Sequence, residues 1–148
     1  MATRAIIAKL DDKGVQAIYC HNDGYLSNNG KILDQHYQNE EKVDELLAQG
    51  DVSIINENIG VKLDFDDYKL FYEKEQCKFY HRDRGEDLMF NEFESEEEYV
   101  EWANGVANGF IYLYAYGAWY VYDNGIVRTY GRASHKFVEL EEALHEIA

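Results

Sequence analysis

Hydrophobic and polar residues alternate in two short runs near the start of the chain, from Arg4 to Leu10 and from Val15 to His21. Successive side chains of a β-strand point to opposite faces of a sheet, so this alternation predicts two strands. A polar segment that ends in Gly14 separates the runs, and glycine suits a turn position with positive φ. The chain is therefore predicted to open with a β-hairpin.

Apolar residues at helical spacing predict helices in residues 32–37, in Glu40–Ala48, after Ser95, and in Glu139–Ile147. Ser95 and Glu98 form a capping-box pattern, with Ser95 as the N-cap of the third of these helices. Two Ala-Asn-Gly triplets, 103–105 and 107–109, are suited to left-handed caps and are predicted to end that helix.

Both faces of the segment Phe110–Tyr116 are apolar, which predicts a central strand. Short apolar runs predict further strands at Lys69–Tyr72, Cys77–His81, Trp119–Tyr122 and Ile126–Tyr130, the last two joined by an Asn-Gly turn. Residues 51–55 are compatible with a strand or a loop, and residues 56–67 are left unassigned.

These elements predict a single α+β domain over residues 1–148, an antiparallel sheet with helices packed on one face. The length is that of one ordinary domain, and the 46% hydrophobic content is enough for a packed core. The chain has no proline, so no proline-rich linker divides it.

The formal net charge of −15 argues against a protein that binds nucleic acid directly or adheres to an anionic membrane, because both need a basic surface. The acidic residues either confer solubility or present a surface that resembles nucleic-acid phosphates. Two cysteines, Cys20 and Cys77, do not form a disulfide framework. With no recognisable signal peptide, the expected location is a reducing cytoplasm.

Acidic residues concentrate between Asp83 and Glu101, where nine of them are opposed only by Arg84 and by Arg82 just before the stretch. Helix capping and the helix dipole account for two or three of the nine. The excess predicts a surface that binds a basic partner, formed by Glu92, Glu94, Glu96, Glu97, Glu98 and Glu101.

Two strings carry a His-x-Asp pattern followed by glycine, around His21-Asn22-Asp23 and His81-Arg82-Asp83. On a continuing strand, residues two apart share a face, so the two pairs together could bind a divalent metal. The alternative is that both strings are turns in which the aspartate bonds its own backbone. We expect no metal and no cofactor.

The Arg82-Asp83-Arg84 triplet could grip a phosphate, with nearby tyrosines stacking on a base. This ligand site would comprise Tyr19, His21, Asp23, Tyr25, Tyr80, His81, Arg82 and Arg84. The alternative is an internal cluster of ion pairs with Glu86 and Asp87. No catalytic residues are assigned, because the chain lacks a P-loop, a Rossmann fingerprint, a nucleophile elbow and zinc-ligand spacing.

Seven short stretches between Thr3 and about Asp87 form a recognisable pattern: Thr3–Ile7, Ala17–Tyr25, Gly30–Leu33, His36-Tyr37, Lys42-Val43, Gly50–Ser53 and Phe79–Glu86. In these residues the segment resembles a family of small proteins encoded by phages and prophages. The family pattern often has tryptophan before the Asp-Gly pair, where this chain has Asn22. The resemblance implies a phage origin and no particular chemistry.

Charge and resemblance together predict a small acidic phage accessory protein that acts by binding. Its expected partner is a host protein with a basic surface, such as a defence or nucleic-acid enzyme, in the cytoplasm of the bacterial host. It would then be anti-CRISPR-like, or a nucleic-acid mimic of another counter-defence type. The alternative is a nucleotide-binding protein that sequesters or cleaves a phosphate-bearing immune signal. Assembly into a homo-oligomer is left open.

Overall fold

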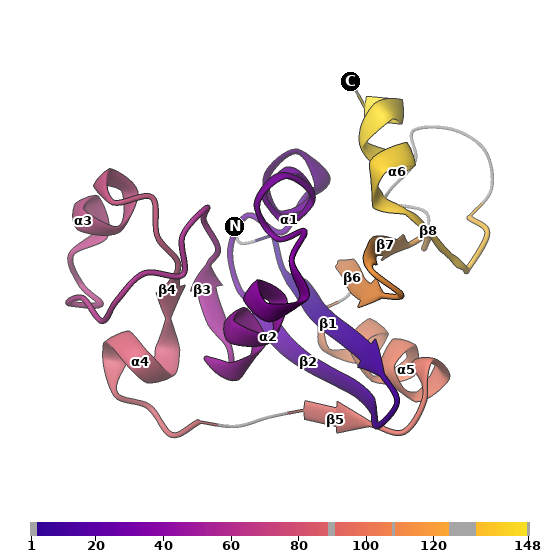
Figure 1. The fold of residues 1–148 in the computed structure, drawn as a ribbon, viewed down its shortest axis with the longest axis horizontal. Helices are drawn as coiled ribbons and strands as arrows, with labels where there is room; N and C mark the ends of the chain where they lie inside the picture. The colour runs from indigo at the N-terminus through magenta and orange to yellow at the C-terminus, as the bar shows by residue number, and fades with distance from the viewer. Residues whose placement is uncertain (1–2, 89–90, 108, 125–132, 148) are drawn as a thin grey trace.

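A computed structural model describes residues 3–88, 91–107, 109–124 and 133–147. One open sheet runs through the molecule, with α3 and α4 at one end and α6 at the other (Figure 1). The strands are β1 (Ala5–Asp11), β2 (Gly14–Cys20), β3 (Val52–Ile54), β4 (Lys78–Phe79), β5 (Asn91–Phe93), β6 (Phe110–Ala115), β7 (Ala118–Tyr122) and β8 (Phe137–Glu139). The helices are the π-helical turn η1 (Leu26–Gly30), α1 (Lys31–His36), α2 (Glu40–Ala48), α3 (Tyr68–Glu73), α4 (Tyr80–Arg84), α5 (Glu96–Val106) and α6 (Leu140–Ile147).

The predicted opening hairpin is confirmed. Strands β1 and β2 pair antiparallel in register from Ala5 opposite Cys20 to Asp11 opposite Gly14. Gly14 has φ +123°, and a Cβ at this position would lie 2.3 Å from the carbonyl oxygen of Phe93. Glycine therefore provides both the backbone angle of the turn and the close approach of β5 to the hairpin.

The sheet is mixed and not purely antiparallel. Its strand order is β4-β3-β2-β1-β6-β7-β8, with β5 also paired to β2. Strand β6 lies in the interior of the sheet, as predicted, but it pairs parallel to β1, and β3 pairs parallel to β2. Hydrophobic patterning specifies which residues face the core and carries no information on strand direction, which explains the difference. The combination of one sheet with helices agrees with the predicted α+β class.

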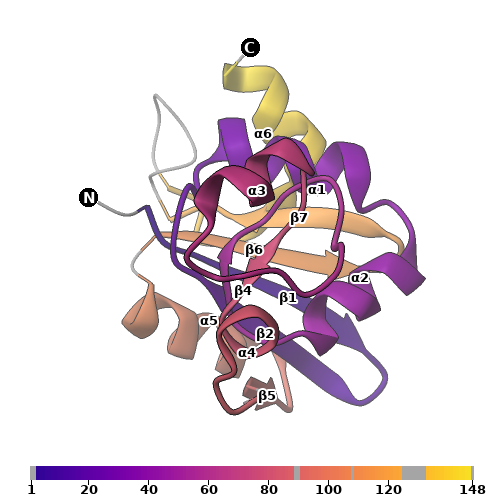
Figure 2. The ribbon, with the colours of Figure 1, turned by 90° about the vertical axis from the view of Figure 1, so that its left-hand side faces the viewer.

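Two hydrophobic cores lie on opposite faces of the sheet. One contains Leu46, Tyr112, Trp119 and Leu140 and is covered by α1, α2 and α6. The other contains Ile6, Leu113, Tyr99 and Ala103, the last two from α5. In Figure 2, α5 lies below the sheet and α1 and α6 lie above it. The prediction of helices on one face is corrected for α5, whose buried stripe is indistinguishable in sequence from that of a helix on the first face.

Two predicted strands are wrong in whole or in part. Residues Lys69–Tyr72 lie in α3, where the Asp67 carboxylate caps the helix by accepting a hydrogen bond from the Leu70 amide (3.3 Å). The segment Cys77–His81 contains only the two-residue strand β4 and then enters α4. Short apolar runs fit a strand or a helix equally well, and the helix-capping role of Asp67 is the signal that was missed.

The role of Ser95 as the N-cap of α5 is confirmed, because its hydroxyl accepts a hydrogen bond from the Glu98 amide at 3.2 Å. The Glu98 carboxylate accepts from the Glu94 amide at 3.1 Å and not from the Ser95 amide, so the capping box is only half formed. The helix continues through Asn104-Gly105 to Val106, so the first Ala-Asn-Gly triplet does not end it. Asn108 of the second triplet and the predicted strand Ile126–Tyr130 lie outside the described residues. No described helix is both long enough and apolar enough to cross a bilayer.

Candidate functional site

The first His-x-Asp string follows β2, where the chain leaves the sheet. A hydrogen bond joins the hydroxyl of Tyr19 to Nδ1 of His21 at 2.9 Å. Asp23 has φ +57°, a left-handed conformation that aspartate tolerates better than most residues, and the buried Gly24 follows it. The string therefore does not continue β2, and His21 and Asp23 do not share a strand face.

The second string does not repeat the geometry of the first. Its histidine and aspartate lie on α4, so they do not share a strand face. The Asp83 side chain is buried, whereas His81 is half-buried and its Nδ1 contacts the backbone carbonyl of Glu86. Among the described residues, no group of three or more His, Cys, Asp and Glu is placed to hold a metal ion.

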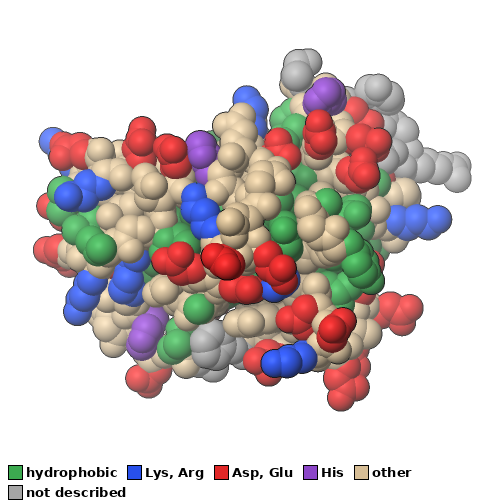
Figure 3. Space-filling view, in the orientation of Figure 1, with side chains coloured by type: hydrophobic (Ala, Val, Ile, Leu, Met, Phe, Trp, Pro, Cys, Tyr) green, Lys and Arg blue, Asp and Glu red, His purple; other side chains and the backbone are tan. Residues whose placement is uncertain are grey.

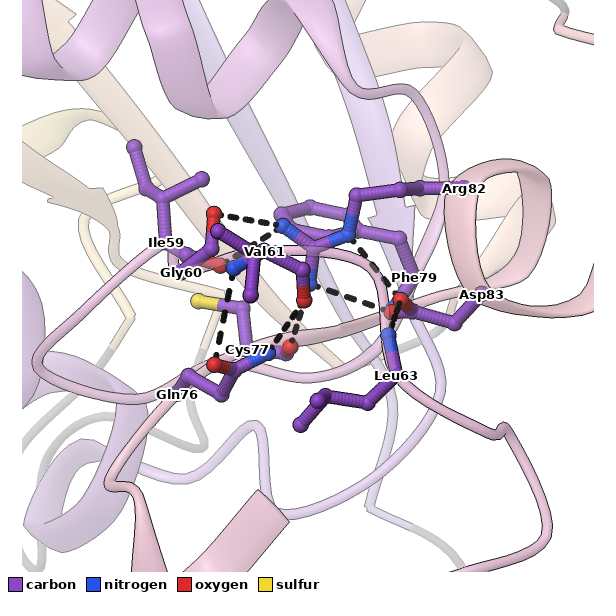
Figure 4. Close-up of polar contacts among 9 residues, drawn as sticks. All are labelled: Ile59, Gly60, Val61, Leu63, Gln76, Cys77, Phe79, Arg82 and Asp83. Carbon is purple, nitrogen blue, oxygen red and sulfur yellow. Dashed lines mark hydrogen bonds and ion pairs between the residues drawn. The ribbon is translucent and has the colours of Figure 1, made fainter. Parts of the chain in front are cut away.

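Arg82 is the centre of a buried network that connects three segments (Figure 4). Its guanidinium donates to the carbonyl oxygens of Ile59 (2.8 Å), Gly60 (3.1 Å) and Cys77 (3.0 Å). Two further hydrogen bonds, of 3.0 and 3.1 Å, join it to the Asp83 carboxylate. These bonds occupy the planar fork that a phosphate would need.

The carboxylate of Asp83 completes this network. It accepts hydrogen bonds from the backbone amides of Leu63 (3.0 Å) and Phe79 (2.8 Å). Arg82 and Asp83 therefore join residues 59–63 to β4 and α4. Arg82 is therefore bonded internally, but to Asp83 and not to Glu86 or Asp87 as the alternative had it, and its assignment to a phosphate site is corrected.

The other residues of the expected ligand site are dispersed. Tyr19, Tyr80 and His81 line a hollow of about 440 Å³ together with three acids, Asp51, Glu86 and Asp87. Burial raises the pKa of the Asp51 carboxyl, whose Oδ1 accepts from the Tyr19 amide at 2.9 Å. Three carboxyl groups in one hollow repel a phosphate, so this hollow does not favour a nucleotide.

The remaining members lie outside this hollow. The guanidinium of Arg84 forms an exposed ion pair with Glu86 at 3.1 Å. Asp23 lines a different cavity, and Tyr25 is 39% exposed at the start of η1. The structure therefore does not bring the eight predicted residues into one site.

Both cysteines are free and buried, in agreement with the sequence. Burial raises the pKa of the Cys20 thiol to about 12 and also raises the pKa of Cys77. Each thiol therefore stays protonated at neutral pH and is a poor nucleophile.

The six acidic residues of the expected partner surface lie on one continuous segment of the chain. All six are exposed: Glu92 lies on β5, Glu94 follows that strand, and the other four lie in the first half of α5. We call this set the β5–α5 acidic surface: Glu92, Glu94, Glu96, Glu97, Glu98 and Glu101. In the part of the chain that the structure describes, none of these carboxylates forms an ion pair. By contrast, Glu40 and Asp44 of α2 both contact the Lys9 ammonium, at 2.8 and 2.7 Å.

A groove of about 480 Å³ runs between α5 and the end of the sheet, and three acids of this surface line it: Glu96, Glu97 and Glu101. Its apolar lining comes from Val100, Tyr122 and Phe137, and the rings of the last two lie edge to face at 5.3 Å. His135 and Lys136 also line it.

Sequence reasoning missed the apolar half of this groove. Tyr122 and Phe137 lie on adjacent strands that only the sheet brings to α5, and Phe137 packs on Tyr99 of that helix with centroids 6.4 Å apart. The sequence offers one sign of this groove, Val100 close to three glutamates, and that pattern alone does not identify a groove.

Acidic side chains are not restricted to the β5–α5 acidic surface. Figure 3 shows them over α2 and α6 as well. Charge by itself therefore does not distinguish this surface, and the adjoining groove does. Searches of protein-family models, curated proteins and solved structures found no match to this chain.

Proposed function

We propose that this protein acts by binding a basic surface of another protein through the β5–α5 acidic surface. The observation that carries the proposal is the groove, in which Glu96, Glu97 and Glu101 stand beside the aromatic rings of Tyr122 and Phe137. A groove that combines three carboxylates and one ammonium, that of Lys136, with apolar side chains is complementary to lysine or arginine, which have an apolar stem and a charged head.

Five of the six carboxylates have no hydrogen bond or ion pair among the described residues, and that of Glu98 accepts one from the Glu94 amide at 3.1 Å. They project from a strand and a capped helix whose backbones are fixed by β2 and by Ser95, so little backbone entropy is lost on binding. Their charges would also accelerate association with a basic partner by electrostatic attraction over about a Debye length, near 10 Å at 0.1 M salt.

The biological setting follows from the sequence resemblance. A phage protein with this surface would inhibit a host defence or nucleic-acid enzyme in the bacterial cytoplasm, because such enzymes carry basic surfaces for phosphates. Carboxylates on β5 and α5 would occupy that surface as a nucleic-acid mimic. The nucleotide-binding alternative loses its main support, because Arg82 is bonded within the protein.

Affinity capture with two matched variants tests the proposal. The first variant is the triple substitution Glu96→Gln, Glu97→Gln and Glu101→Gln in the groove. The second is Glu141→Gln, Glu142→Gln and Glu146→Gln on the exposed side of α6, which changes the net charge equally. Immobilised wild-type protein and both variants are incubated with bacterial lysate, and the bound proteins are quantified.

The expected result is a basic host protein that wild type and the α6 variant retain and the groove variant loses. Equal loss with both variants would show that net charge alone is responsible. Retention by the groove variant would contradict the proposal directly. Thermal unfolding of each variant first confirms that it is folded.

A further inference from the structure

Lys78, on β4, has a fully buried side chain, with 2% of the residue exposed. Within the described residues, no group accepts a hydrogen bond from its ammonium nitrogen, which is the one buried side-chain nitrogen or oxygen there without a partner. A buried ammonium is normally paired with a carboxylate or with carbonyl oxygens, because burial of an unpaired charge is costly. An exception of this kind requires an explanation, and a ligand is one.

Aromatic rings surround this ammonium. Its Nζ lies 3.4 Å from the ring centroid of Tyr68 and 3.9 Å from that of Phe65, and Phe71 is 5.8 Å away. Ring faces attract a cation but cannot accept three directed hydrogen bonds, so they compensate the charge only in part. Tyr68 is itself 61% exposed, so it covers the ammonium without being held in the core.

Lys78 also lines a cavity of about 300 Å³ between β3, β4 and α3. Asn22, Asn56 and Gln76 line it, as do Tyr68 and Tyr72. Asp23 provides a single carboxylate. The lining thus combines a cation, neutral polar groups and aromatic surface, the usual composition of a small-molecule site.

We propose that this cavity binds a small organic anion, a carboxylate or a monophosphate joined to a planar group. The Tyr68 ring turns aside, the anionic head takes its place beside the Lys78 ammonium, and the planar group stacks on the exposed ring of Tyr72. The nearby carboxylate of Asp23 disfavours a polyphosphate, since each added negative charge is repelled. This site is separate from the groove at α5 and does not depend on the partner-binding proposal.

Calorimetric titration with two charged probes and their uncharged counterparts tests this site. Benzoate is compared with benzamide, and adenosine 5′-monophosphate with adenosine. We expect wild-type protein to bind at least one charged probe and neither uncharged one, and the probe that binds more tightly assigns the head as carboxylate or phosphate. Lys78→Met should weaken that binding at least about tenfold, whereas Lys62→Met, at an exposed lysine, should leave it unchanged.

A second variant keeps the test independent of the folding of Lys78→Met. Tyr68→Ala uncovers the ammonium, so it should bind the same probe as tightly as wild type or more tightly. Failure of both charged probes to bind wild type and Tyr68→Ala would overturn the proposal. Binding that survives Lys78→Met unchanged would do the same. The triple glutamine variant of the groove should bind the probe like wild type, which separates this result from the proposed function.

Discussion

At the scale of single residues, Arg82 shows how one side chain fixes a segment without regular structure. Residues 59–63 contain no helix or strand, yet two of their carbonyl oxygens and one amide are bonded to the Arg82–Asp83 pair. The Asp83 side chain of this pair is buried, and its carboxylate also accepts a hydrogen bond from the Phe79 amide. Removal of the guanidinium leaves that carboxylate charged and without its cation.

Arg82→Met should lower the free energy of unfolding by about 3–5 kcal/mol, the usual cost of breaking a buried ion pair from one side. Urea denaturation measures the change. Arg84→Met is the matched control, because Arg84 forms an exposed ion pair with Glu86, and it should cost about 0–1 kcal/mol. Equal losses in the two variants would contradict the structural role of Arg82.

Asp51 gives a prediction of pH dependence. Burial raises the pKa of its carboxyl above the ordinary value of 3.8, so the folded protein binds a proton at this carboxyl more readily than the unfolded chain does. The charged carboxylate therefore costs stability at neutral pH, and this cost disappears as the pH falls through the raised pKa. Asp51→Asn should stabilise the protein at pH 7 and keep an acceptor for the Tyr19 amide, with the gain vanishing at acidic pH.

Urea denaturation of wild type and Asp51→Asn across this pH range measures the effect. Asp11→Asn is the control, because the exposed Asp11 carboxylate also accepts one backbone hydrogen bond, from Lys13 at 2.8 Å. A gain for Asp51→Asn that does not change with pH would refute the burial argument.

At the scale of elements, the hairpin turn at Gly14 supports β5 as well as β1 and β2. Gly14→Ala introduces a Cβ at φ +123° that would lie 2.3 Å from the Phe93 carbonyl oxygen. Gly117→Ala is the comparison, since Gly117 has φ +78° and open space around the added Cβ.

We expect Gly117→Ala to cost about 1–2 kcal/mol from backbone strain alone. Gly14→Ala should cost more, because β5 must also move away from the turn. Urea denaturation gives both values. If Gly14→Ala costs no more than Gly117→Ala, the close packing of β5 on the hairpin is not as described.

The elements with a local cause could be predicted from the sequence. The opening hairpin depends on alternation and Gly14, and the start of α5 depends on Ser95 and Glu98. Contacts between distant segments could not be predicted in this way. The parallel pairing of β1 with β6, the position of α5 on the second face and the internal bonding of Arg82 all depend on residues far apart in the sequence.

The candidate sites follow the same division. The six glutamates of the β5–α5 acidic surface are close in the sequence, so their clustering was predictable. The groove beside them needs Tyr122 and Phe137, and the second cavity needs Lys78 near Tyr68 and Phe65. No spacing rule links these residues, because β3, β4 and α3 come together only in the folded chain.

At the scale of the whole molecule, the net charge of −15 makes repulsion between carboxylates a general cost of folding. Salt screens this repulsion, so the thermal unfolding midpoint should rise from low salt to about 0.2 M NaCl. Relief of about 1 kcal/mol would correspond to about 2–4 °C for a chain of this size. Calorimetry measures the change, and a midpoint that falls with salt would show that attractive ion pairs dominate instead.

The central claim is that the protein binds a basic partner through the groove and glutamates of the β5–α5 acidic surface. The most direct test is the dissociation constant of the captured partner between about 50 and 500 mM NaCl, a range over which screening of exposed charges becomes strong. Wild type and the α6 triple variant should lose affinity steeply with salt. The groove triple variant should bind more weakly at low salt and depend less on salt. A dissociation constant independent of salt, or the same salt dependence for all three proteins, would contradict the account.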